Sequence, residues 1–451
     1  MQAEFDRRRL VLLIQLYVIL LVIEGALRKW LLPSLSDPLL LVRDPVAIVI
    51  CVLGYRSRNL VFDGYMRSLF LLLAGFVTIG ALQLINGIGG SPFVIAYGLR
   101  TYLLHLPVAF VMARVLNRED VHQILMMFLW AALPMAVLMA IQFDSSPRAW
   151  VNLGVAGHRG QIFAAPGRIR PAGTFSFVNG PMGFFSIAIA ALIASAVDLR
   201  GVSWPLRLAG WVAVSLAAAV SGSRSFLAAV AGVMLVGIAG WARGRSTKLG
   251  RGLVASALTA LVAVNVLGSF DTVREGAGVI QSRFDQWGNG GLGRRLMYDY
   301  NTVQWAIVDS PILGVGLGAG TNAAAALEGT KGFRWGEGEW PRVIFEAGPI
   351  LGLLYLFWRV WITLAVGRAA LRVSGSSVLL PLLLWGACAS SLLSGQWGQT
   401  SIQGFGIFTL GLTLAAGRTA LLQRPTVPVV QRSPVWMQRQ VAGGARSRAR
   451  A

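Results

Sequence analysis

One short segment of the chain combines acidic, basic and aromatic side chains: Glu337-Gly338-Glu339-Trp340-Pro341-Arg342. A carboxylate can accept the proton of a hydroxyl group, and a guanidinium can hold an anion. A single glutamate here could simply cap the apolar helix that follows. Two glutamates beside an arginine and a tryptophan instead predict a reactive site. Its expected parts are a general base, Glu337 or Glu339, an anion clamp, Arg342, and a sugar-stacking ring, Trp340.

Two further arginines lie in tight turns next to apolar segments. Arg170 opens Arg170-Pro171-Ala172-Gly173-Thr174-Phe175, with Asn179 just before the next apolar segment, and Arg224 lies in Ser221-Gly222-Ser223-Arg224-Ser225. The planar guanidinium offers donors that match phosphate oxygens. A charge at such a turn is costly at a membrane surface unless it is used. We therefore expect both arginines to bind a phosphate or diphosphate, although any one loop arginine could instead pair with a carboxylate.

Composition excludes a water-soluble domain. The chain has 451 residues, of which 55% are hydrophobic and only 13% are charged, whereas soluble domains are about a quarter charged. The net charge of +21 does not indicate nucleic-acid binding, because the Lys and Arg residues lie between apolar runs. Both cysteines lie inside apolar runs without metal-ligand spacing, so no metal site is expected.

Long apolar runs must position these residues. A bilayer core needs about 20 apolar residues per helix, and this length predicts an all-α, polytopic membrane bundle. Twelve transmembrane segments are expected, at residues 10–27, 39–54, 66–86, 93–114, 121–143, 180–198, 205–221, 225–241, 250–268, 343–366, 377–394 and 402–421.

The distribution of basic residues predicts the orientation. Every second connection is rich in Arg and Lys, which places both termini in the cytoplasm. The membrane domain, 1–421, is followed by a basic tail, 422–451, which we expect to be disordered against lipid. Two long loops, 144–179 and 269–341, fall on the opposite side, and the second is expected to contain a helix over 294–308. Arginines there oppose the insertion bias, which indicates an anionic partner.

Other features fit this site less directly. The run Gly314-Val315-Gly316-Leu317-Gly318-Ala319-Gly320 lacks dinucleotide-binding spacing, so it predicts either close packing or a backbone nest for an anion. Charged residues also occur near bilayer depth. We expect Arg43 and Asp44 to pair as a structural lock. Arg100 and His105 share a helix and could line a polar cavity, although His105 taken alone is more typical of a satisfied buried histidine.

At these motifs the chain resembles the O-antigen ligase and polymerase superfamily, membrane glycosyltransferases that use polyprenyl-diphosphate-linked glycans. The resemblance covers roughly residues 140 to 400 and depends on the order of the motifs. They are Arg170-x-x-Gly173-Thr174-Phe175 with Asn179, Ser223-Arg224, Arg295 ahead of Pro311-Ile312-Leu313-Gly314-Val315-Gly316, and Glu346-x-Gly348. One departure is the His-Asn pair of the family, whose position in the long loop corresponds to Glu337 here. His158, in the other long loop, is a further candidate base.

The resemblance implies inverting, metal-independent glycosyl transfer without a cofactor, on the periplasmic face of a bacterial inner membrane. The implied donor is a polyprenyl-diphosphate-linked glycan, and the acceptor is a glycan or lipid. Arg170, Arg224, Arg295 and Arg342 would hold the diphosphate, and a glutamate would take the acceptor proton. A transporter or flippase of lipid-linked oligosaccharide is the alternative, although carriers tend to show internal repeats, which this chain lacks. A scaffold for other polysaccharide enzymes is a third reading.

Overall fold

The fold is given by a computed structural model of the chain. It describes residues 2–60, 64–157, 162–165, 167–197, 199, 201–244, 247–285, 291–321, 324, 338–374 and 378–422. The predicted tail therefore lies outside the described residues beyond position 422.

Helices account for nearly all of the described structure. The first half contains α1 (Gln2–Ala26), the π-helical turn η1 (Leu27–Leu31), η2 (Pro33–Leu35), α2 (Ser36–Leu39), α3 (Asp44–Arg56), α4 (Gly64–Ile85), α5 (Pro92–Leu103), α6 (Leu106–Val115), α7 (Arg118–Asp144), η3 (Trp150–Asn152), η4 (Val155–Gly157), β1 (Phe163–Ala165) and β2 (Arg168–Ile169). The second half contains α8 (Gly180–Ser195), α9 (Trp204–Val220), α10 (Arg224–Gly244), α11 (Thr247–Leu267), α12 (Asp271–Asp285), α13 (Gly291–Asp309), α15 (Glu339–Val373), α16 (Leu380–Ser394) and α17 (Thr400–Leu422).

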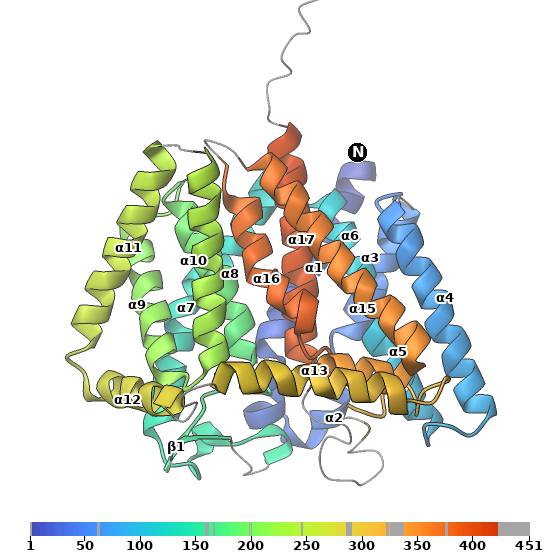
Figure 1. The fold of residues 1–451 in the computed structure, drawn as a ribbon. Coiled ribbons are helices and arrows are strands. Elements are labelled where there is room, and N and C mark those ends of the chain that lie inside the picture. Colours follow the sequence, from blue (N-terminus) through green and yellow to red (C-terminus); the bar gives the residue numbers. More distant parts are fainter. Residues whose placement is uncertain are drawn as a thin grey trace, which may run out of the picture.

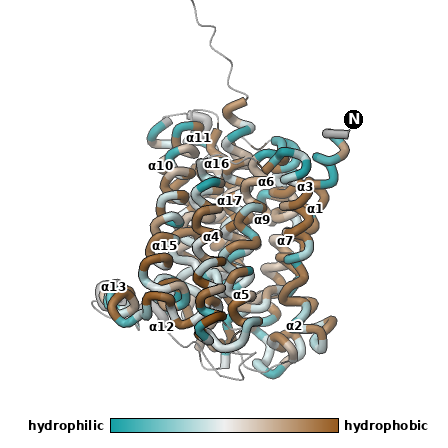
Figure 2. Tube along the Cα trace, turned by 90° about the vertical axis from the view of Figure 1, so that its right-hand side faces the viewer, coloured by the Kyte–Doolittle hydropathy of each residue, from teal (hydrophilic) through white to brown (hydrophobic). Residues whose placement is uncertain are grey.

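The helices have the composition of a multi-pass membrane protein. Among the described residues, nine helical stretches are long and apolar enough to cross a bilayer, and α8, α9 and α16 are shorter apolar helices. All twelve predicted segments therefore fall on apolar helices. Hydrophobic residues dominate along the helices, and hydrophilic residues gather near the two ends of the bundle (Figure 2).

The two ends of the bundle differ. The N-terminus and the end of α17 lie at one end, whereas β1, α2, α12 and α13 lie at the other, which we call the loop end (Figure 1). Both predicted long loops thus contribute structure at the loop end. Within the first, β1 and β2 pair as a short antiparallel hairpin, with Phe163 opposite Ile169, which the all-helical prediction did not include.

The predicted helix over 294–308 is confirmed by α13, which runs across the loop end (Figure 1). It packs on the start of α15, where the Trp305 and Phe345 ring centroids are 4.7 Å apart. Helix α15 is interrupted at Gly348, whose φ of 77° is accessible mainly to glycine, and Pro349 follows. Because of this break, the first turns of α15 form a separate buried segment under α13.

Candidate functional site

Four charged residues of α15 form one buried group, which we call the α15 cluster: Glu339, Arg342, Glu346 and Arg359. Arg342 donates to Glu339 Oε2 at 3.0 Å and to Glu346 Oε1 at 2.9 Å, and Arg359 Nη1 lies 2.7 Å from Glu339 Oε1. All four side chains are at most 6% exposed. Two cations therefore balance two carboxylates inside the protein, as a buried ionic group requires.

Sequence spacing explains how the cluster forms. Glu339, Arg342 and Glu346 are separated by three and four residues, so they share one face of the first part of α15. Arg359 lies beyond the break at Gly348 and binds Glu339 from the second part of the helix. Arg359 also donates to the carbonyls of Ser391, Leu392 and Gly395, which attaches the cluster to the end of α16.

The glycine-rich segment 314–320 wraps around the carboxylate of Glu346. Gly318 N donates to Oε2 at 3.1 Å, Gly320 N donates to Oε1 at 3.0 Å, and the Tyr102 hydroxyl donates to Oε2 at 2.6 Å. The segment is thus a backbone nest for an anion, and its anion is a side chain of the protein. It is also closely packed, since a Cβ on Gly98 would lie 2.4 Å from Gly318 N.

The predicted residues of the 337–342 segment are differently placed. Glu339 is fully buried, and both of its carboxylate oxygens accept hydrogen bonds from arginines. Trp340 is half-buried and donates from Nε1 to the Leu393 carbonyl at 2.9 Å. Glu337 lies outside the described residues, as does His158. Arg295 lies on α13, but the position of its side chain is not among those described.

The structure brings the turns of Arg170 and Arg224 together. Arg170 Nη2 donates to Ser223 Oγ at 3.1 Å, and Ser223 directly precedes Arg224 at the start of α10. The turn itself needs a glycine, because Gly222 has a φ of 54° and a Cβ there would lie 2.7 Å from that of Ala164 in β1. The hairpin of the first loop therefore packs on the turn that carries the second arginine.

The chain after Arg170 is fixed to α1 and α7. Gln142, which had no role in the sequence analysis, binds both Gly173 N and Gly173 O. The Lys29 ammonium also donates to Gly173 O, at 2.7 Å, and the Thr174 hydroxyl donates to the Val22 carbonyl. A Cβ on Gly25 would lie 2.3 Å from Ser176 N, so the backbone of this segment packs directly against α1. Together these contacts hold in place the segment that begins with Arg170.

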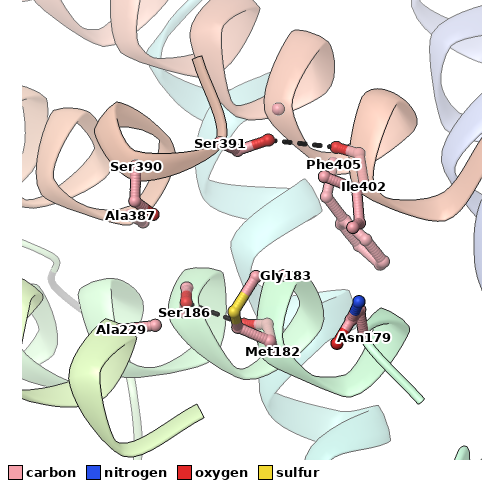
Figure 3. Close-up of a pocket in the computed structure, with 11 residues that line it drawn as sticks. Asn179, Met182, Gly183, Ser186, Ala229, Ala387, Ser390, Ser391, Ile402 and Phe405 are labelled. Atoms are coloured by element: carbon pink, nitrogen blue, oxygen red, sulfur yellow. Dashed lines mark hydrogen bonds between the residues drawn. The ribbon is translucent and has the colours of Figure 1, made fainter. Parts of the chain in front are cut away.

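Asn179 lies at a crevice inside the bundle. Its Nδ2 donates to Gln399 Oε1 at 3.3 Å, in the connection between α16 and α17. The crevice is lined mainly by apolar and hydroxyl side chains of α8, α10, α16 and α17 (Figure 3). The same connection passes Arg342, because a Cβ on Gly398 would lie 3.6 Å from its guanidinium carbon. One connection thus adjoins both Asn179 and the α15 cluster.

Arg168 joins the two long loops. It donates from Nε and Nη2 to both carboxylate oxygens of Glu275 in α12, at 2.6 and 2.5 Å, and from Nη1 to the carbonyls of Phe143 and Asp144. The hydrogen bonds with Glu275 raise the pKa of the Arg168 guanidinium, and they outweigh partial burial, which lowers it. Thr272 adds a second link by donating to Asp144 Oδ2 at 2.7 Å.

Reversing this pair tests the link. We expect Arg168→Glu to lower the stability of the protein by about 1 kcal/mol, the scale of a partly exposed ion pair, because two carboxylates would then face each other. The double variant with Glu275→Arg should recover part of that loss. Thermal unfolding in detergent measures both. A double variant that is less stable than the sum of the single effects would contradict the pairing.

A second buried group, which we call the α1 cluster, surrounds the end of α1: Glu24, Arg28, Lys29, Arg43, Asp44 and Arg100. The predicted Arg43–Asp44 pair is wrong. Arg43 instead binds Glu24 at 3.2 Å, and Asp44 binds Arg100 at 2.6 Å and His105 at 3.3 Å. Glu24 also binds Arg28 at 3.2 Å. The Tyr17 hydroxyl lies between Arg43 and His105 and makes the group continuous.

Sequence reasoning missed Arg28, Lys29 and Arg359 as site residues. A signal existed for Arg28, which follows Glu24 by one helical turn. No protein-family model, curated protein or solved structure matches this chain. Fold and site therefore define its class by themselves: a multi-pass, helical membrane protein with charged clusters at one end of the bundle.

Proposed function

We propose that this protein transfers a glycan from a polyprenyl-diphosphate carrier to an acceptor hydroxyl at the loop end. One observation carries the proposal. The hydrogen bond from Arg170 to Ser223 places an arginine of one loop beside the turn that carries Arg224. Two guanidinium groups held by separate elements suit a diphosphate, which has oxygens on two phosphorus atoms.

The proposed chemistry follows from these charges. The acceptor oxygen attacks the anomeric carbon, the bond from that carbon to the phosphate oxygen breaks, and the carrier diphosphate leaves with the electron pair. Arg170 and Arg224, together with Arg295, stabilise the charge that develops on the leaving diphosphate. Trp340 is the proposed sugar-stacking ring, while Asn179 contributes an amide from the crevice. Arg342, which the sequence analysis placed in the clamp, is buried and bound to Glu339 and Glu346, so we leave it out of the clamp.

The general base is the proton acceptor from the attacking hydroxyl, and a base must be able to reach that proton. Glu339 is buried with both oxygens bound by arginines. We therefore favour Glu337 as the base, and assign Glu339 the role of holding Arg342 and Arg359 in place.

The proposed topology places the loop end in the periplasm. All twelve apolar helices cross the bacterial inner membrane, and both termini lie in the cytoplasm. The basic connections at the N-terminal end support this orientation through the positive-inside rule.

A transporter of the same lipid-linked glycan is the second candidate. Helix breaks support it, because α15 is interrupted at Gly348 and the chain between Pro92 and Val115 is divided into α5 and α6. Carriers commonly use such discontinuous helices at their substrate sites.

Reconstitution separates the two candidates. Purified protein in liposomes would be supplied with a fluorescent glycan on polyprenyl diphosphate together with an acceptor glycan. We expect a covalently extended product and free polyprenyl diphosphate, both resolved by chromatography and mass spectrometry. Protein-free liposomes are the control. Movement of an unaltered glycan lipid across the bilayer, with no new glycosidic bond, would instead support the transporter.

A further inference from the structure

The α1 cluster contains more positive than negative charge. Among the residues that the structure describes, its four cations, Arg28, Lys29, Arg43 and Arg100, are accompanied only by the carboxylates of Glu24 and Asp44. A proton on His105 would only add to this surplus. The nearby Asp37 is exposed and makes no ion pair within the described part of the chain. The α15 cluster, by contrast, is balanced.

This surplus is buried. Lys29 is 3% exposed, Arg28 is 7% exposed, and Arg43 is fully buried. An uncompensated charge in such surroundings is costly, and proteins normally pair it with an opposite charge. Because the surplus lies at the loop end, against the segment that begins with Arg170, the missing negative charge can come from a ligand.

Lys29 is the cation with capacity for that ligand. Its ammonium has three donors, yet among the described residues it makes one hydrogen bond, to the Gly173 carbonyl, and no ion pair. It also lies 4.4 Å from the centre of the Trp30 ring. The three arginines, in comparison, each bind a carboxylate.

Local geometry brings this cation close to the surface. Arg28 and Lys29 are both buried within the π-helical turn Leu27–Leu31, a geometry often found at functional sites. Next to them, the Trp30 ring contacts that of Trp150 with centroids 5.6 Å apart, and Trp150 is 64% exposed. A flexible lysine stem can therefore reach a ligand beside these rings.

We propose that the α1 cluster binds a phosphate or diphosphate ester, with Lys29 as the residue that contacts it. This is a second anion site, separate from the proposed clamp of Arg170 and Arg224. The identity of its ligand rests on the proposed function. If the first site binds the donor, the phosphate at the α1 cluster belongs to the acceptor, and the acceptor is a phosphorylated or lipid-linked glycan.

Native mass spectrometry of the purified protein with farnesyl diphosphate counts the sites directly. We expect two bound molecules for the unmodified chain, one for Lys29→Met and two for Lys29→Arg. Titration of Lys29→Met should show this site weakened about tenfold or more, the scale of a hydrogen bond to a charged group. The control is Arg7→Met, which removes a cation of the same helix that is paired with Asp120, and it should still bind two.

The outcomes separate this proposal from the proposed function. Lys29→Met that binds as many molecules as the unmodified chain overturns the α1 site, even if Arg170→Ala loses one. Conversely, if Lys29→Met binds one molecule fewer and Arg170→Ala binds as many as the unmodified chain, the α1 site is supported and the proposed arginine clamp is ruled out. Two further probes identify the source of the bound phosphate. Inorganic diphosphate tests for a free phosphate, and nanodiscs with phosphatidylglycerol in place of phosphatidylcholine test for a bilayer headgroup, as distinct from an isoprenoid carrier.

Stability without ligand provides a second measurement. Removing an uncompensated ammonium should leave the unfolding temperature unchanged or raise it, and farnesyl diphosphate should raise that temperature more in the unmodified chain than in Lys29→Met. If Lys29→Met unfolds earlier and gains as much from the ligand, Lys29 serves only to hold Gly173 and the proposal fails.

Discussion

Replacing Arg170 or Arg224 by alanine should lower the rate of glycan transfer by about 10²- to 10³-fold, the usual effect of removing one donor that stabilises a developing negative charge. The two arginines act on one diphosphate in the proposed site, so the double variant should lose little more than either single one. A lysine at either position keeps the charge but not the bidentate geometry, and should recover only part of the rate.

Arg148→Ala is a matched control for these variants. Arg148 is exposed in the same loop, and its side chain makes no hydrogen bond or ion pair within the described part of the chain. Its loss should leave transfer unchanged. Rates would be measured in reconstituted liposomes after thermal unfolding has shown that each variant is folded. Undiminished product from both Arg170→Ala and Arg224→Ala would rule out the diphosphate clamp.

Glu339→Gln should lower the stability of the protein by about 3–5 kcal/mol, because breaking a buried ion pair from one side leaves an uncompensated charge. In this case two guanidinium groups, those of Arg342 and Arg359, lose their shared carboxylate. Combining Glu339→Gln with Arg359→Met removes one of the stranded charges and should restore part of the stability. Thermal and denaturant unfolding in detergent measure the difference.

Glu337→Gln should behave in the opposite way. We expect the transfer rate to fall by at least about 10²-fold, the scale of losing a general base, while the unfolding temperature stays the same. The pair of variants therefore assigns the base. If Glu339→Gln keeps its stability and loses its rate, while Glu337→Gln retains both, the base is Glu339.

The helices could be predicted because a bilayer sets their length. Runs of about 20 apolar residues are enough to locate them, and the period of Leu296, Tyr300, Val303 and Ile307 predicted α13. Boundaries were less predictable where polar residues continue a helix. The stretch expected at 343–366 extends from Glu339 to Val373, because Glu339 and Arg342 neutralise each other inside the protein.

Ion-pair partners could not be predicted in the same way. Arg43 and Asp44 are neighbours in sequence, yet each pairs with a residue of a different helix. These pairs depend on which helices lie side by side, and the apolar runs in the sequence carry little information about that arrangement. The glycine-rich segment shows the same limit, since its sequence predicted either close packing or anion binding and did not decide between them. Only the fold shows that its anion, Glu346, lies 26 residues beyond Gly320.

The hydrogen bond from Gly320 to Glu346 also fixes the distance that the chain between Thr321 and Gly338 has to bridge. Gly320 is held at Glu346, and the chain resumes at the start of the same helix, seven residues or about 10 Å away. Because both attachment points are set by the bundle, added length between them incurs only a small further closure entropy. Added residues in this stretch should therefore lower the stability of the protein little, provided that they leave the buried Ala324 and the proposed base Glu337 in place.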